Sequence, residues 1–223
     1  SCPHKKQASI HNITEFVKHS YAGPLLKKEL EAINLVIQNK KDPVTCIIGG
    51  SKISTKINVI SSLIEKVNSI IIVGAMANNF FVYKNLKVGK SIVEENTKEI
   101  IKDIYDKAKK YNCEIIIPED CLVGTNFNGT GKRKNLNAIA DNEIILDIGP
   151  TTVQSIKNKI DRSNTVLWNG PAGYFENENF MSGTMFIADA ISKNTRYKSL
   201  ISILGGGDTL AAINKSKQKL SFT

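Results

Sequence analysis

The stretch that most constrains what this chain can fold into is Ser199 to Asn214, with the sequence SLISILGGGDTLAAIN. An apolar run rich in Ile and Leu meets three consecutive glycines, and the helix-forming residues LAAI follow Asp208 and Thr209. This order predicts a strand, a glycine turn and a helix. Glycine allows a close approach of the backbone to a ligand, and the first amides of a helix lack intrahelical partners. The stretch therefore predicts a phosphate or nucleotide site, with a tight turn capped by Asp208 as the alternative.

The same succession of apolar strand, turn and helix recurs along the chain. The strands expected from continuous apolar runs are 44–48, 69–73, 114–117, 144–148, 165–167 and 200–204. The helices expected between them are 25–40, one starting near Ser54, 76–83, 94–111, 149–160 and 184–192. Continuous apolar runs are typical of parallel strands that are covered on both faces. The fold class predicted is therefore α/β, with three layers: a Rossmann-like parallel sheet and helices on both of its faces.

Four of the expected strands run into turns that contain glycine. These turns are Gly49-Gly50, Gly74, Gly149 and the glycines at 205–207. Ligands of open parallel sheets bind outside the carboxyl ends of the strands, so the turns are expected to converge on one site. The polar stretch 124–142 fits a hairpin or an exposed loop better than a low-complexity linker.

The composition limits the classes of function. The formal net charge is +9, and only three of the 30 basic residues are arginine. Readers of nucleic acid usually favour arginine interleaved with aromatic side chains, so neither nucleic acid nor a membrane is expected as a partner. The diffuse positive charge suits an anionic substrate equally well, and genomic base composition is an alternative explanation for the many Lys, Asn and Ile residues. No signal peptide is evident, which favours the cytoplasm. The four cysteines, Cys2, Cys46, Cys113 and Cys121, fit buried free thiols.

Six segments, taken together and in order, resemble phosphoglycerate kinase. They are GGSKISTK at 49–56, GAMANNFF at 74–81, LDIGPTT at 146–152, WNGPAGYFE at 168–176, FMSGT at 180–184 and GGGDT at 205–209. The resemblance covers the carboxyl-terminal, nucleotide-binding half of such an enzyme. It implies a hinge or interdomain remnant at 1–24 and a nucleotide-binding domain at 25–223 that is truncated at its C-terminal end.

The resemblance implies a phosphate end to the site. Lys52 is similar to the lysine that follows the transferring phosphoryl group, and a mobile cation suits the charge spread over that group's oxygens; the alternative is a solvated lysine at a helix start. Lys56 is similar to a second lysine near the nucleotide phosphates. The catalytic set implied is Lys52 with the amides of Gly205, Gly206 and Gly207.

The resemblance also implies how the rest of ADP or ATP is held. Asp208 would ligate Mg²⁺, and Thr209 would contact phosphate. The remaining nucleotide-binding positions are Gly74 and Ala75 under the adenine, Asn169 and Pro171 beside the nucleotide, and Glu176 at the ribose hydroxyls. The family usually has a second glycine where Ala75 stands, so one methyl group would narrow the pocket. Trp168 is expected in the core.

Two departures from the family's pattern affect the acid substrate. A segment resembling HRxHxS supplies an arginine and a histidine to the phosphoglycerate site, and the corresponding stretch here has Lys5 and Gln7. Lysine loses the bidentate geometry of arginine. The family's amino-terminal domain is absent from this sequence, and the chain stops at Thr223, just before a last glycine-rich loop.

The function that the resemblance implies is reversible phosphoryl transfer between 1,3-bisphosphoglycerate and ADP, with Mg²⁺, in glycolysis. The parent enzyme is expected to be a cytoplasmic monomer, and phosphoglycerate would bind only with the missing amino-terminal domain, so this chain alone is expected to be inactive. The alternative is a non-catalytic truncated remnant that retains at most Mg-nucleotide binding. An NAD-dependent dehydrogenase is disfavoured because no G-x-G-x-x-G follows an early strand.

Overall fold

The computed structural model describes residues 40–215 and 220–223. The chain divides into two compact units, Ser1–Lys40 and Lys41–Thr223, and the fold below is that of the second. The hinge expected at 1–24, the helix expected at 25–40 up to its last residue, Lys5, Gln7 and Cys2 lie outside the described residues.

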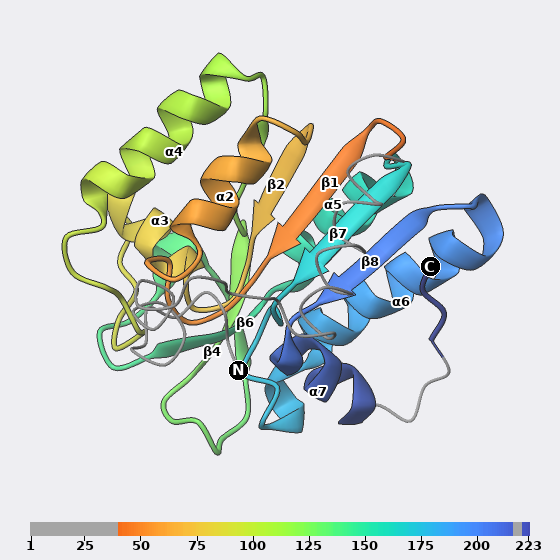
Figure 1. The fold of residues 1–223 in the computed structure, drawn as a ribbon. Helices are drawn as coiled ribbons and strands as arrows, with labels where there is room; N and C mark the ends of the chain where they lie inside the picture. The colour runs from red at the N-terminus through yellow and green to blue at the C-terminus, as the bar shows by residue number, and fades with distance from the viewer. Residues whose placement is uncertain (1–39, 216–219) are drawn as a thin grey trace, which may run out of the picture. The chain divides into compact units, whose positions relative to one another are not determined.

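The centre of the described unit is a sheet of five parallel strands in the order β3-β2-β1-β7-β8 (Figure 1). The strands are β1 (Val44–Ile48), β2 (Ser69–Ile72), β3 (Glu114–Ile116), β7 (Thr165–Asn169) and β8 (Ile201–Gly205). In the central strands nearly every residue is buried, because helices cover both faces, and this explains the continuous apolar runs of the sequence. The parallel sheet predicted from those runs is confirmed.

Helices form the two outer layers. They are α2 (Ile57–Ile64), α3 (Ala77–Tyr83), α4 (Lys98–Lys110), α5 (Pro150–Asp161), α6 (Ser182–Lys198) and α7 (Gly207–Lys215), with short 3₁₀ turns η2 (Leu136–Ala138) and η3 (Glu178–Phe180). Helices α2, α3 and α4 pack on one face of the sheet, and α5 and α6 pack on the other (Figure 1). The three-layer α/β fold is therefore confirmed.

Alternate residues of the strands supply two separate cores. Cys46 and Ile48 of β1 belong to the core under α2, α3 and α4, whereas Ile47 of the same strand packs with Trp168 in the core under α5 and α6. Side chains of a strand point alternately to opposite faces, so one apolar run fills both cores. Trp168 is buried, as expected. Among the described cysteines, residues 46, 113 and 121 are buried free thiols, which confirms that prediction for them.

A second, smaller sheet corrects one part of the sequence prediction. It contains β4 (Asp120–Gly124), β5 (Lys132–Asn135) and β6 (Ile144–Ile148) in the antiparallel order β5-β4-β6. The expected strand 144–148 therefore exists, but it lies outside the parallel sheet. Its apolar run reflects burial in a small sheet, and the polar stretch before it forms the β4–β5 hairpin.

The turn at Gly149 consequently serves a different purpose from the one expected. A carboxylate oxygen of Asp120 accepts from the amide of Thr151, 3.1 Å away, and the other accepts from the amide of Thr152 at 2.8 Å. These are first-turn amides of α5, so Asp120 caps that helix from another strand. A Cβ atom at Gly149 would lie 2.3 Å from Cγ of Asp120. Glycine is required here for a helix cap, not for a ligand at the edge of the parallel sheet.

Two helix starts also differ from the prediction. Helix α2 begins at Ile57 instead of near Ser54, so residues 51–56 form turns and Lys52 does not share a helical face with Lys56. Helix α4 begins at Lys98 instead of 94, because Asn96 has a left-handed φ of 58° that interrupts a right-handed helix. Helix α6 is longer than the expected 184–192, because its polar ends, which reach Ser182 and Lys198, carry no apolar pattern from which to predict them.

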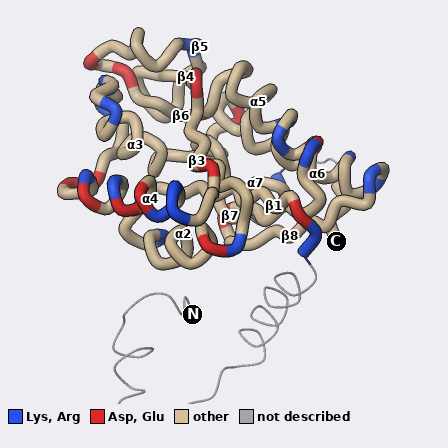
Figure 2. Tube along the Cα trace, turned by 90° about the horizontal axis from the view of Figure 1, so that it is seen from above, with Lys and Arg blue, Asp and Glu red and all other residues tan. Residues whose placement is uncertain are grey.

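Charged residues are spread over the surface of the described unit. Figure 2 shows basic and acidic positions alternating along α4, with no separate stripe of one sign. Lys102 pairs with Glu99 on that helix, and Lys107 pairs with Glu65 of the neighbouring segment. No helix among residues 40–215 is both long enough and apolar enough to cross a membrane.

Candidate nucleotide-binding site

The carboxyl ends of three parallel strands meet at the candidate site. In the sheet register, Ile48 of β1 lies opposite Asn169 of β7, which lies opposite Gly205 of β8. The amide of Gly49 donates to the carbonyl oxygen of Asn169 at 2.8 Å. The turns after β1 and β8, predicted to converge, therefore flank Asn169 on its two sides.

Lys56 lies at this meeting point, and Lys52 comes four residues earlier in the same loop. The Lys56 ammonium donates to Oδ1 of Asn169. Partial burial lowers the pKa of Lys56, and the charge of Asp208 opposes that shift. Lys56 is therefore a poorly solvated cation that a phosphate could neutralise. Lys52 is exposed, as a lysine that follows a moving group would be.

The turn after β8 presents backbone amides to solvent. Gly206 has φ of 92°, a left-handed value that favours glycine, and α7 begins at Gly207. Gly206, Gly207 and Asp208 are exposed. Asp208 lies within the first turn of α7, so it is placed beside the open amides and does not occupy the capping position before the helix. The arrangement offers unpaired N–H groups with a carboxylate next to them.

Thr209 is placed differently from its neighbours. Its side chain is fully buried, and its hydroxyl oxygen accepts from the amide of Gly170 at 2.7 Å. That hydrogen bond fixes the start of α7 to the turn that follows β7. The phosphate contact expected of Thr209 would therefore come from its backbone amide, while its hydroxyl holds the site together.

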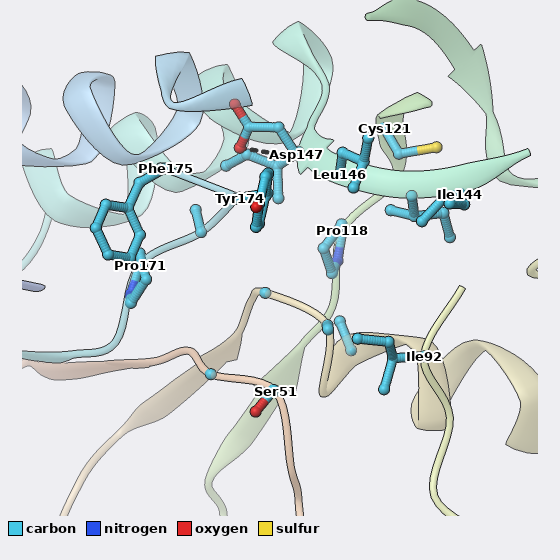
Figure 3. A pocket seen from close by; sticks show the side chains of 18 of the residues that line it. Ser51, Ile92, Pro118, Cys121, Ile144, Leu146, Asp147, Pro171, Tyr174 and Phe175 are labelled. Carbon is cyan, nitrogen blue, oxygen red and sulfur yellow. Dashed lines mark hydrogen bonds between the residues drawn. The ribbon is translucent and has the colours of Figure 1, made fainter. Parts of the chain in front are cut away.

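A pocket of about 440 Å³ opens beside these strand ends (Figure 3). Five of the predicted nucleotide-binding residues line it: Gly74, Ala75, Pro171, Glu176 and Asp208. Most of the remaining lining is apolar and comes from the small antiparallel sheet, from α3 and from loops. Figure 3 shows Ile144 and Leu146 of β6 together with the loop residues Ile92, Pro118, Tyr174 and Phe175. An apolar slot with a few polar groups at hand suits a flat heterocyclic base.

The Gly74 turn forms one wall of the pocket and is held by backbone contacts. Gly74 has φ of 69°, and its amide donates to the carbonyl of Ala172 at 3.1 Å. A Cβ atom at Gly74 would lie 2.8 Å from the amide nitrogen of Gly50. Only glycine lets the turns after β1 and β2 approach this closely. Ala75 follows in the same wall, where its methyl group reduces the space.

Glu176 lies on the segment between β7 and η3. Its side chain is exposed, and the Lys215 ammonium of α7 lies 3.4 Å from its backbone oxygen and 3.3 Å from that of Phe175. Among the described residues, the carboxylate of Glu176 forms no ion pair, because Lys215 engages the backbone instead. A free carboxylate on the pocket wall can accept hydrogen bonds from ribose hydroxyls.

Sequence reasoning missed the pocket's far wall. Leu146 and Asp147 line the pocket from β6, a strand that the apolar pattern assigned to the parallel sheet but that belongs to the small antiparallel sheet. Burial raises the pKa of Asp147 to about 7, although the amides of Gly183 and Ile148 and the hydroxyl of Ser182 donate to it. The motif LDIGPTT was the available signal, but its spacing alone does not show that Asp147 faces the pocket lining.

The donor set suits Mg²⁺ only together with a nucleotide. Among the described residues, no three His, Cys, Asp or Glu side chains gather as a metal cluster. Mg²⁺ usually keeps several waters and binds one or two carboxylates plus phosphate oxygens. Asp208, exposed and lining the pocket beside open amides, fits that single protein ligand.

The comparison with known families agrees with this geometry. A family model described as phosphoglycerate kinase matches residues 1–223. This chain belongs to the phosphoglycerate kinase family. The phosphoglycerate kinase of Wolbachia pipientis subsp. Culex pipiens (strain wPip) is 44% identical over 215 residues, and that of Coxiella burnetii (strain RSA 493 / Nine Mile phase I) is 37% identical over 214. These matches cover 96% and 95% of the chain, but only 54% of either relative.

Solved phosphoglycerate kinase structures share the fold. The Coxiella burnetii enzyme superposes with a TM-score of 0.79 and 37% identity, covering 87% of this chain and 50% of that one. The enzyme of Pyrococcus horikoshii OT3 gives a TM-score of 0.72 at 24% identity, which supports the fold alone, over 99% and 55% of the two chains. The chain thus spans about half the length of the phosphoglycerate kinases it matches.

Proposed function

We propose that this chain is the nucleotide-binding part of a phosphoglycerate kinase and that it binds ADP and ATP with Mg²⁺. The reaction proposed for the whole enzyme is reversible phosphoryl transfer between 1,3-bisphosphoglycerate and ADP, giving 3-phosphoglycerate and ATP, in the glycolysis of the cytoplasm. Lys52 and the amides of Gly205, Gly206 and Gly207 would stabilise the transferring group by position and charge, so no covalent intermediate is required.

One observation carries this proposal: an apolar pocket and a set of anion-binding groups lie side by side at the same strand ends. Ala75 and Pro171 line the pocket, and so does Asp208, which belongs to the turn with the open amides. Lys56 reaches Asn169 between the two turns. A base in the pocket would direct its phosphates toward these amides and lysines, with Glu176 at the ribose between them.

Titration calorimetry of Mg-ADP with the 223-residue chain tests the proposal. We expect binding with a dissociation constant of about 1 mM or tighter, the range typical of enzyme substrates. Glu176→Ala should weaken both Mg-ADP and adenosine, because it removes a ribose contact. Asp208→Asn should weaken Mg-ADP about tenfold, which corresponds to one lost charge-assisted interaction, and should leave adenosine unchanged.

The matched control is Glu178→Ala, which removes an exposed carboxylate two residues from Glu176. It should leave both affinities within about twofold of the unmodified chain. A chain that is folded by circular dichroism but shows no heat of binding at several millimolar Mg-ADP would overturn the proposal. If Glu176→Ala and Glu178→Ala lose the same amount of affinity, Glu176 has no specific role at the ribose, although the proposal of nucleotide binding still stands.

A further inference from the structure

The loop between β1 and α2 carries both lysines of the proposed phosphate site, yet little within the loop fixes it. Helix α2 has no side-chain cap and no acidic residue in its first turn. The loop's own contacts are short-range, such as the Lys56 amide to the carbonyl of Ile53 at 2.8 Å and the Thr55 hydroxyl to the carbonyl of Lys52 at 2.9 Å. Ile53 is fully buried and anchors the loop in the core. The exposed residues that follow it, Ser54 and Thr55, therefore depend on another segment to fix their position.

That support comes from Glu94, 40 residues further along the chain. One carboxylate oxygen of Glu94 accepts from the amide of Ser54 at 3.0 Å, and the other accepts from the Ser54 hydroxyl. Partial burial opposes ionisation, but these hydrogen bonds and the charge of Lys52 together hold the pKa of Glu94 below its ordinary value. Glu94 is thus ionised at neutral pH, and its two hydrogen bonds from Ser54 hold the loop midway between Lys52 and Lys56.

Glu94 is itself held by α3, a helix that contributes other residues to the pocket lining. Its amide donates to Oδ1 of Asn79 at 2.9 Å, and Asn79 is buried on α3. The side-chain amide of Asn79 donates to the carbonyl of Met76 at 3.2 Å, and the Met76 amide donates to the carbonyl of Gly50 at 2.9 Å. These contacts close a ring from the lysine loop through Glu94 to the turn that lines the pocket and back to the loop.

We infer that Glu94 is a positioning residue, which holds the loop so that Lys52 and Lys56 face the phosphates of a nucleotide whose base occupies the pocket. Glu94 is not one of the residues that line the pocket, and its carboxylate accepts from Ser54, so it acts through the loop and not on the ligand. This inference rests on the proposed function, because it assigns the two lysines to the phosphates. The inference goes beyond the proposed function because it names a residue that connects the lysine loop with the segments that line the base pocket.

Calorimetry with two ligands separates positioning from a general structural role. Mg-ADP uses the lysines, whereas adenosine uses only the pocket. We expect Glu94→Ala to weaken Mg-ADP about tenfold, as for the loss of a hydrogen bond to a charged group, and to leave adenosine within about twofold. Glu94→Gln, which keeps one acceptor oxygen, should lose less. The matched control, Glu95→Ala, removes the exposed carboxylate next in the chain and should leave both ligands unchanged.

Amide hydrogen exchange of the free chain gives a readout that needs no nucleotide. The Ser54 amide should exchange about tenfold faster in Glu94→Ala, and at the unchanged rate in Glu95→Ala, because only the first removes its acceptor. Absence of Mg-ADP binding by the unmodified chain would overturn the proposed function. Unchanged Ser54 exchange, unchanged Mg-ADP affinity, or equal losses of Mg-ADP and adenosine in Glu94→Ala would overturn the role of Glu94.

Discussion

The narrowest contact in the candidate site is between Gly49, which follows β1, and the turn that follows β7. A Cβ atom at Gly49 would lie 2.2 Å from the carbonyl oxygen of Pro171 and 2.7 Å from that of Gly170. Carbon and oxygen atoms in contact normally lie about 3.3 Å apart or more. Gly49→Ala would therefore push two backbone segments apart by about 1 Å where β1 and β7 meet.

The magnitude follows from which atoms must move. The obstructing atoms belong to the backbone, so no side-chain rotation can relieve the contact, and the cost should lie near the upper end of overpacking, about 3 kcal/mol. A change of that size lowers the melting temperature of a domain of 150–250 residues by about 6–12 °C. The hydrogen bond from the Gly49 amide to Asn169 should also weaken, so Mg-ADP affinity should fall with stability.

Gly207→Ala is the matched control, since it adds the same methyl group in the same site. No atom lies within 4 Å of a Cβ at Gly207, and the residue begins α7. Alanine keeps the amide and favours helix by up to about 1 kcal/mol. Thermal unfolding should give an unchanged or slightly higher melting temperature for Gly207→Ala. Equal melting temperatures for Gly49→Ala and the unmodified chain would refute the close approach of the β1 and β7 turns.

Three further outcomes follow from the described residues. Burial raises the pKa of Asp147 to about 7, above the value of about 3.9 expected in the unfolded chain, so the protonated side chain stabilises the fold at low pH and this stabilisation is lost as pH rises through 7. The unfolding free energy of the unmodified chain, relative to that of Asp147→Asn, should therefore fall by about 4 kcal/mol between about pH 4 and pH 8. If this difference does not change with pH, the hydrogen bonds to the Asp147 carboxylate outweigh its desolvation. The 223-residue chain alone should show no phosphoglycerate-dependent ATP turnover above a Lys52→Ala control in a coupled assay. In-line positioning of both substrates supplies about 7–11 kcal/mol of barrier reduction, and this chain is expected to hold only the nucleotide. Activity that Lys52→Ala abolishes would contradict this. Oligonucleotide binding in a fluorescence titration should disappear at physiological salt, since the lysines are dispersed, and binding that persists with sequence preference would contradict it.

The parts of the fold that depend on neighbouring residues were predictable from the sequence. A run such as 201–205 followed by glycines specifies a strand and a turn by local chemistry, and the burial of β1 and β2 explains why apolar runs indicated a parallel sheet. The run 144–148 has the same local chemistry as those strands. Its membership of the antiparallel sheet depends on pairing with β4, which periodicity does not specify.

The candidate site shows the same division between local and distant information. The glycine turns and lysines are recognisable because each motif is continuous in the chain. Two other contacts join residues about 30–40 positions apart: the hydrogen bond from Ser54 to Glu94 and the cap that Asp120 provides for α5. Acidic residues at those positions look like any other surface charge in the sequence, so only the fold shows what they hold.

The most direct test of nucleotide binding at these strand ends is to map amide chemical shifts of the chain by NMR as Mg-ADP is added. We expect the largest changes on the loop 49–56, the turn at Gly74 and Ala75, and the turn 205–209, while amides of α4 on the outer surface stay unchanged. Adenosine alone should move the Gly74 turn and leave 205–209 in place, because it lacks phosphates. Changes confined to residues outside these turns, or no changes at saturating Mg-ADP, would contradict the account.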